Sequence, residues 1–223
     1  MERITHGPFG LQVFTGGAFA ENTALLWCLE TRAAVVVDPG AAAGAALDAA
    51  EEMGLDLQAI VLTHAHLDHV EGIPHVLDRV ALPIHLHPDD RPLYDAAPAQ
   101  AQMFGLTAPA LPPPDEALVP GEPFPVGACT LEIRFTPGHA PGHVILVGEG
   151  FVIAGDTVFA GSIGRTDLPG GDLETLLSSI RREILSLDDD TVLYPGHGPA
   201  TTVGHERRSN PFLRSDFGGS AFA

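Results

Sequence analysis

Lysine is missing from the sequence, so arginine supplies all of its fixed side-chain cations. The 223 residues carry 11 arginines against 29 aspartates and glutamates, which gives a formal charge of −18 at pH 7. A chain this acidic repels phosphate backbones and anionic lipid headgroups, so the composition argues against nucleic acid or a membrane as a partner. We interpret the acidic residues as a solvated surface that aids solubility.

Cysteine is scarce, and long hydrophobic runs are missing. Cys28 and Cys129 lie far apart in the sequence and form no CxxC pair, which favours two free, buried thiols in a reducing compartment. The first residues, MERITHGPFG, lack the basic and then apolar pattern of a signal peptide. No run approaches the roughly 18 apolar residues of a membrane span. These absences predict a cytoplasmic protein.

The sequence does have enough apolar residues, 45%, and enough length for a single folded domain over residues 1–223. Strands closed by Gly or Pro-Gly turns are followed by helices in two similar halves, about 1–115 and 120–210. The expected strands are 11–17, 22–30, 33–40, 57–66, 80–88, 129–139, two within 144–156, and a last one at 191–200. The expected helices are 41–53, about two turns near 70–79, and 171–187 with Asp172 as N-cap. Segment 97–125 is rich in Pro and Ala and predicts a crossing loop. The pattern predicts an α/β protein, a four-layer αββα sandwich.

The densest cluster of metal-ligand side chains lies in LTHAHLDHVEG, residues 62–72. His64 and His66 are two apart at the end of a predicted strand, so their side chains point the same way and can bind one ion. Asp68 and His69 follow where a helix begins, turned to another side, and can bind a second ion. Imidazoles and carboxylates without thiolates suit zinc, and also manganese or iron.

Three further candidates come from turns that follow strands: His139 in TPGHAPGH, Asp156 in IAGDTVF and His197 in YPGHGP. Glycine beside each of them lets the backbone approach closely. Five ligands would serve one ion and leave a spare partner, whereas seven fit two ions that share a bridging carboxylate and a bridging hydroxide. Two metals about 3.5–4 Å apart form a recognised hydrolytic device.

The remaining histidines carry a weaker signal. His143 lies four residues after His139 and is a candidate for supporting a ligand from behind. The others are interpreted as strand or surface residues: His6, His75, His85, His87 and His205. Among them, His85 and His87 repeat the HxH spacing.

With these motifs in place, the chain resembles the metallo-β-lactamase fold superfamily, whose pattern is HxHxDH followed by His, Asp and His. Within it the chain is most similar to the glyoxalase II-like (hydroxyacylglutathione hydrolase-like) enzymes in their short bacterial form. The segments that carry this resemblance are TPGHAPGH, GDTVFAGSIGRTDLPGGD, YPGHGPATT and NPFLR. The resemblance implies an αββα sandwich with the site at one edge of the two sheets.

The resemblance also implies roles for the seven candidates. His64, His66 and His139 would hold one metal, Asp68, His69 and His197 would hold the other, and Asp156 would bridge them. The implied reaction is hydrolysis of a small thioester such as S-D-lactoylglutathione by a metal-bridging hydroxide, which two zinc ions (or iron or manganese) make available near neutral pH. Asp68 would be both a ligand and the catalytic residue that orients the hydroxide.

Several alternatives stay open. Full-length glyoxalase II has a C-terminal helical domain that helps to bind glutathione, and we expect no such domain after NPFLR here, which leaves glutathione specificity open. Arg165 is a candidate either for contact with an acidic substrate or for a structural ion pair. A persulfide dioxygenase would use one iron on His64, His139 and Asp156. A lactonase, a β-lactamase and a metal-binding protein without turnover are further possibilities, whereas the charge disfavours a nuclease. The loop around Met103 and Phe104 either overhangs the pocket or forms a separate apolar cluster.

Overall fold

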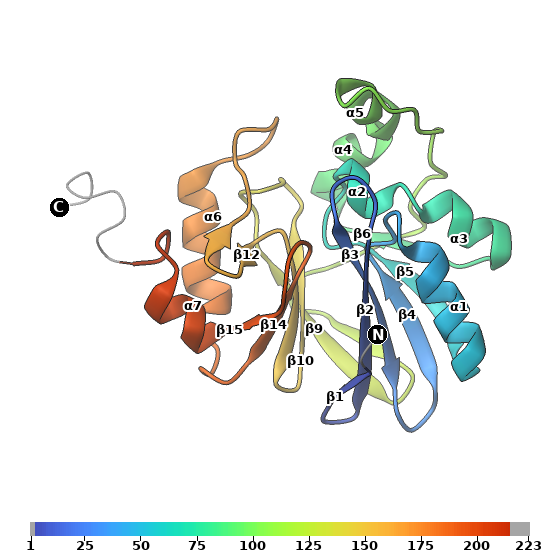
Figure 1. Cartoon of the computed structure of the whole chain (residues 1–223), viewed down its shortest axis with the longest axis horizontal. Helices are drawn as coiled ribbons and strands as arrows, with labels where there is room; N and C mark the ends of the chain where they lie inside the picture. Colours follow the sequence, from blue (N-terminus) through green and yellow to red (C-terminus); the bar gives the residue numbers. More distant parts are fainter. Residues whose placement is uncertain (1–2, 215–223) are drawn as a thin grey trace.

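The strands β3 (Glu21–Cys28) and β4 (Ala33–Val37) are buried along their whole length, as expected of strands whose sheet is covered on both faces. The computed structural model describes residues 3–214 and shows what covers them. Leu25 and Trp27 of β3 pack with helical residues on one side, and Ala24 and Leu26 pack against a second sheet on the other. A third apolar cluster lies between that second sheet and its own helices. Figure 1 shows the resulting order of helices, sheet, sheet and helices, so the predicted αββα sandwich is confirmed.

The first sheet takes its strands from the first half of the chain and the second sheet from the rest. In spatial order the first contains β1 (Ile4–His6), β2 (Phe9–Gly16), β3, β4, β5 (Asp56–Val61), β6 (Ile84–Leu86) and β7 (Glu116–Ala117). The second contains β15 (Thr201–Thr202), β14 (Val192–Pro195), β11 (Phe151–Gly155), β10 (Val144–Gly148), β9 (Cys129–Phe135) and β8 (Pro123–Val126). A separate small hairpin pairs β12 (Val158–Phe159) with β13 (Ser162–Ile163).

Helices cover the outer faces and one edge of the sheets. They are α1 (Ala43–Met53), α2 (Leu67–Val70), α3 (Ile73–Arg79), α4 (Arg91–Asp95), α5 (Ala97–Met103), α6 (Leu173–Ser179), which continues as a π-helical turn over Ile180–Ile184, and α7 (Val203–Ser209). In Figure 1, α1 and α3 flank the first sheet, and α6 and α7 flank the second. None of the helices within residues 3–214 is both long and apolar enough to cross a membrane.

Strand direction places the site. β4 runs parallel to β5 in the first sheet, and β11 runs parallel to β14 in the second. β9 has the same direction as β11, because both are antiparallel to β10, which lies between them. The segments that leave the carboxyl ends of these strands therefore gather at one edge of the sandwich, and they are the segments that carry the predicted ligands.

Several elements differ from those predicted. The supposed crossing loop 97–125 contains a helix (α5) and two strands (β7 and β8), and 191–200 is not the last strand, because β15 and α7 follow it. The helix near 70–79 is divided into α2 and α3; between them the Gly72 amide donates a hydrogen bond to the Pro39 carbonyl at 2.8 Å, in a place where a Cβ would overlap the Gly40 and Pro39 carbonyls. Asp172 is confirmed as an N-cap: its carboxylate accepts a hydrogen bond from the Thr175 amide at 2.8 Å.

The two cysteines are free and buried, as the sequence predicted. Although they are distant in the sequence, they lie at the ends of β3 and β9 in the same apolar cluster, and the Cys129 thiol donates a hydrogen bond to the Pro8 carbonyl. Cys28 and Cys129 both belong to the apolar cluster between the sheets, so we interpret them as residues that pack the core.

Candidate metal centre

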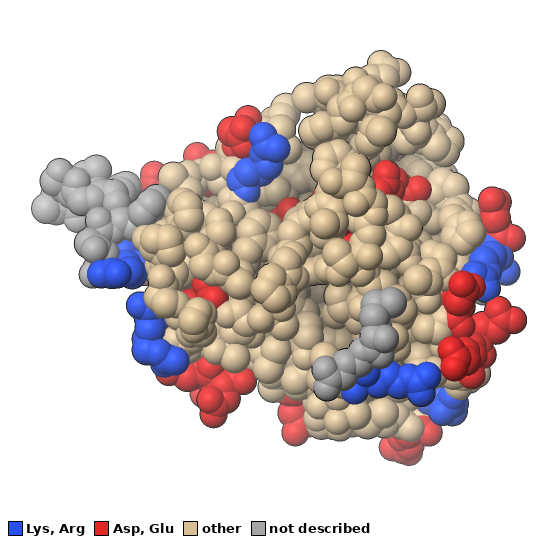
Figure 2. All heavy atoms as spheres, viewed as in Figure 1, with Lys and Arg blue, Asp and Glu red and all other residues tan. Residues whose placement is uncertain are grey.

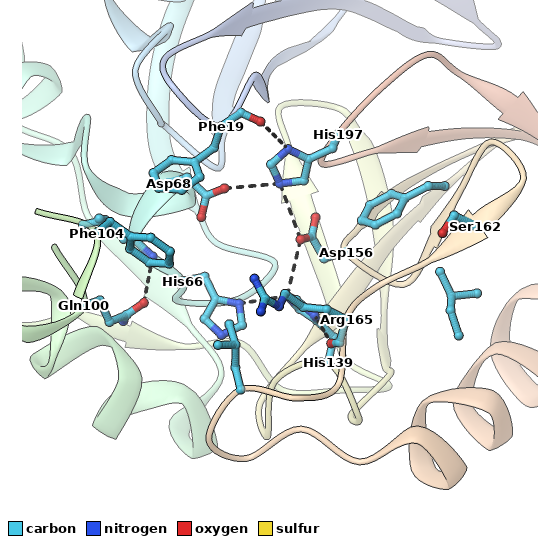
Figure 3. A pocket seen from close by; sticks show the side chains of 14 residues that line it. Phe19, His66, Asp68, Gln100, Phe104, His139, Asp156, Ser162, Arg165 and His197 are labelled. Carbon is cyan, nitrogen blue, oxygen red and sulfur yellow. Dashed lines mark hydrogen bonds and ion pairs between the residues drawn. The ribbon is translucent and has the colours of Figure 1, made fainter. Parts of the chain in front are cut away.

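All seven side chains predicted as ligands lie together at the floor of one cavity of about 320 Å³. Figure 3 shows the cavity, with its lining residues supplied by both halves of the chain. Of these seven, five line the cavity directly: His66, Asp68, His139, Asp156 and His197. His64 and His69 lie beneath them and are fully buried.

Three imidazoles form the first group of donors. His64, His66 and His139 each present one ligand atom, and these atoms lie within 4.8 Å of one another. His139 Nε2 is 2.8 Å from His66 Nδ1 and 3.2 Å from His64 Nε2. As expected for an HxH pair at a strand end, both histidines of the pair face the same partner.

Asp68, His69 and His197 form the second group, again with donor atoms within 4.8 Å of one another. His197 Nε2 lies 3.2 Å from Asp68 Oδ2. Asp156 lies between the groups: its Oδ2 is 3.4 Å from His139 Nε2 and 3.5 Å from His197 Nε2, and its Oδ1 is 3.5 Å from His69 Nε2. Figure 3 shows Asp156 between His139 and His197.

The second ring nitrogen of four of these histidines is already engaged, which fixes the orientation of each ring. His64 Nδ1 lies 3.1 Å from Thr63 Oγ1, and His69 Nδ1 lies 3.0 Å from Asp38 Oδ2. His139 Nδ1 and His197 Nδ1 donate to main-chain carbonyls of Arg165 and Phe19, at 2.7 and 3.1 Å. In all four rings Nε2 is the atom directed at the cluster.

Unpartnered atoms indicate that the cluster is built for cations. Among residues 3–214, the buried polar atoms that have no hydrogen-bond partner include His66 Nε2, His69 Nε2 and Asp156 Oδ1. Leaving such groups unsatisfied in a protein interior costs about 1–3 kcal/mol each. A metal ion held by the facing donors offsets that cost for His69 and Asp156, so the donor set fits a metal.

The protonation of the donors supports the same conclusion. Burial lowers the pKa of His66 to about 3, so this imidazole is neutral and able to bind a metal. Although burial opposes it, His69 and His197 hold the pKa of Asp156 well below its usual range. Burial likewise opposes the charging of His197, but hydrogen bonds to Asp156 and Asp68 raise its pKa to about 10. The carboxylates of Asp68 and Asp156 therefore concentrate negative charge in the cluster, and this charge favours the binding of a cation.

Asp38 is a supporting residue that the sequence interpretation missed. It follows β4, is buried, and accepts hydrogen bonds from the Thr63 amide at 2.7 Å and the Thr63 hydroxyl at 2.6 Å. With its contact to His69, it connects β4 to the ligand segment after β5. The available signal was VVVDPG, a carboxylate directly after a buried strand, which is the placement that identified Asp156.

We expect Asp38→Asn to weaken zinc binding about tenfold, because it removes an acceptor that orients His69 and replaces it with a donor. Competition against a chromophoric chelator measures the affinity. The control is Asp48→Asn, which changes an exposed carboxylate of α1 that pairs with Arg79. Equal affinity in the wild type and Asp38→Asn would restrict Asp38 to a packing role.

Three other polar side chains hold the ligand segments in place. Asp90 is fully buried, and its carboxylate accepts from the Ala65 amide at 2.8 Å and the Gly142 amide at 2.5 Å, which joins the segments that carry the first group. Gln100 of α5 bonds the amide of Leu67 and the carbonyl of Ala65. Asn22 Nδ2 donates to the carbonyls of Pro195 and Gly198, on either side of His197.

His143 is placed behind the ligands. Its Nε2 accepts a hydrogen bond from the Asp156 amide at 3.0 Å, its Nδ1 lies 2.9 Å from Thr136 Oγ1, and its ring stacks on that of His64. The other histidines lie outside the cluster: His85 and His87 pack on Phe124 and Phe135, and His6 pairs with Tyr194. The Arg165 guanidinium forms two hydrogen bonds to Asp167, both at 2.8 Å.

Fold and donor set together define a class of protein. A sequence profile described as "Metallo-beta-lactamase superfamily" matches residues 16–197, and the chain belongs to this superfamily. It is a metallo-hydrolase with a His/Asp metal site.

Particular relatives narrow the comparison. The chain is 40% identical to "Hydroxyacylglutathione hydrolase GloC" of Haemophilus influenzae over 215 residues, which cover 92% of this chain and 98% of that one. Among solved structures, BLEG-1 B3 metallo-β-lactamase shares 36% identity with a TM-score of 0.85, covering 91% of this chain and 99% of the other. The di-iron-bound form of TTHA1623 shares 40% identity with a TM-score of 0.82, covering 91% and 100%.

Proposed function

We propose that this protein hydrolyses thioesters such as S-D-lactoylglutathione and that it uses two metal ions. The observation that carries the proposal is the convergence of seven donors in two groups, with Asp156 facing both. The similarity to a hydroxyacylglutathione hydrolase along nearly the full chain supports it. The donors suit zinc, and iron or manganese would also fit them.

In this proposal His64, His66 and His139 hold one ion, Asp68, His69 and His197 hold the other, and Asp156 binds both. Ions held there would supply hydroxide near neutral pH and polarise the thioester carbonyl. The remaining contributions come from the protein, which positions the substrate and orients the attacking oxygen.

Asp68 is the proposed catalytic residue. It lies at the start of α2 with its side chain about 15% exposed to the cavity, and His197 holds one of its oxygens. The other oxygen would accept a hydrogen bond from the attacking oxygen and so orient it toward the carbonyl carbon. In this proposal the thiolate is a good leaving group and departs without protonation by a strong general acid.

Metal titration combined with a thioester assay tests the proposal. Metal-free protein should gain hydrolytic activity on S-D-lactoylglutathione as zinc is added, and the activity should reach its plateau at two equivalents per chain, with iron and manganese tested in parallel. Elemental analysis of the protein as purified gives the native metal. A plateau at one iron per chain, with oxygen consumed when glutathione persulfide is added, would instead indicate the dioxygenase.

A further inference from the structure

The segment between Asp95 and Asp115 contains no charged residue, in a chain with a formal charge of −18. Of the large apolar side chains exposed in the described part of the chain, half lie within it: Met103, Phe104 and Leu106. Figure 2 shows an uncharged prominence at the upper right of the molecule, while most of the charged side chains lie on the flanks and lower edge. The exposed apolar side chains of this acidic protein are therefore concentrated in the segment that includes Phe104.

Phe104 connects this patch to the cavity. Its ring lines the cavity and meets Phe19 edge-on, with ring centroids 5.0 Å apart at 77°. Phe19 is fixed in turn, because its carbonyl accepts the hydrogen bond from His197 Nδ1. Together with Leu67, the two rings form one wall of the cavity. Figure 3 shows Phe19 and Phe104 on the same side of the cavity as Asp68.

This wall offers no free polar group to a substrate. Gln100, its one polar member, uses its amide oxygen on the Leu67 amide and its amide nitrogen on the carbonyls of Ala65 and Leu93. A charged or hydroxylated group placed against this wall would lose its hydration and gain no hydrogen bond. The wall therefore favours an apolar group.

The opposite wall differs. It comes from β12, β13 and the segment after them, and it includes apolar side chains (Phe159, Ile163, Leu168) but also Ser162 and Arg165. Ser162 and Arg165 give this wall polar groups that the first wall lacks, although the exposed Arg165 guanidinium also pairs with Asp167. An anionic part of a substrate is therefore best placed on this side of the cavity. A thioester with an anionic thiol part would then direct its acyl group to the Phe19–Phe104 wall.

We propose that Phe19 and Phe104 form an acyl-binding wall that makes the enzyme selective for thioesters with apolar aliphatic or aryl acyl groups. The inference rests on the proposed thioester hydrolysis and specifies its substrate class. It predicts that an apolar acyl group such as butyryl is preferred to lactoyl, which carries a hydroxyl, and to acetyl, which is too short to reach the wall.

The test is a series of glutathione thioesters that share one thiol and differ in the acyl group: acetyl, D-lactoyl, butyryl and phenylacetyl. We expect kcat/KM of the zinc-loaded protein to rise about two- to fourfold for each methylene that the wall buries, so that butyryl exceeds acetyl about four- to sixteenfold. Phe104→Ala should lower kcat/KM for butyryl several-fold more than for acetyl, and Phe104→Leu should restore part of the preference.

Met103→Ala is the matched control. Met103 precedes Phe104, is more exposed (69% against 46%), and does not line the cavity, so this change should leave the butyryl preference as it is. Similar kcat/KM values for acetyl and butyryl in the wild type would overturn the acyl wall, as would an equal loss on both substrates in Phe104→Ala. Failure to hydrolyse any of the four esters would instead overturn the proposed function, and the acyl wall with it.

Discussion

Replacing Asp156 with alanine should remove metal binding from both groups of donors and lower thioester hydrolysis by about 10³-fold. Asp156 faces histidines of both groups, so we expect its loss to affect both proposed metal positions at once, unlike the loss of any single histidine. The magnitude follows from simpler cases, because removing even one donor from a site that stabilises an oxyanion costs about 10²–10³-fold. Metal content after dialysis and kcat/KM on S-D-lactoylglutathione measure the two effects.

Two comparisons keep this result interpretable. Asp156→Asn preserves the shape of the side chain but removes its charge. It therefore shows whether any loss of folding in Asp156→Ala comes from the void left by the shorter side chain or from the missing charge. Asp78→Ala removes an exposed carboxylate of α3 and should change neither metal content nor rate. Two tightly bound ions in Asp156→Ala would show that the groups bind metal independently, and the proposed role of Asp156 in binding both ions would be wrong.

The position of the site was predictable because its residues share one placement in the sequence. His64, Asp156 and His197 each follow closely after a short buried strand, and parallel strands bring such ends to the same edge of a sheet. The αββα architecture was predictable for a related reason, since the long apolar strands required cover on both faces. Local patterns therefore carried the essential information about fold and donors.

The supporting residues were not predictable, because their partners lie far away in the sequence. Asp90 bonds amides 25 and 52 residues away, and Asn22 reaches carbonyls more than 170 residues away. Neither residue belongs to a local motif. Helix α5 was missed for a similar reason: its Pro- and Ala-rich sequence has weak periodicity, and Gln100 holds it through hydrogen bonds to the ligand segment. In each case tertiary contacts determine what the local sequence leaves open.

Gly196 allows a second test of the site, in which every donor is kept and one methyl group is added. A Cβ at this position would overlap Asp156 Oδ1 and lie 2.6 Å from His69 Cε1, well inside the 3.5–4.0 Å of an ordinary carbon contact. The backbone of Gly196 is held at the same time, because its amide and carbonyl bond to Gly155 and Asn22. The added methyl in Gly196→Ala must therefore displace Asp156 or His69. We expect metal binding to weaken and kcat/KM to fall about 10²-fold, the usual cost of an error of about 1 Å in a catalytic arrangement.

The control has to separate this steric effect from the general cost of losing a glycine. Gly150 lies in the turn between β10 and β11 and has φ of +76°, and a Cβ added there would meet nothing within 4 Å beyond its chain neighbours. Gly150→Ala should therefore lower stability by about 1–2 kcal/mol, seen as a lower Tm, while metal content and hydrolysis are kept. Gly196→Ala should show the reverse: a folded protein with a small change in Tm and a large loss of bound metal. If Gly196→Ala binds two ions and turns over at the wild-type rate, Asp156 and His69 do not need the positions they occupy here, and the assignment of Asp156 to both ions fails.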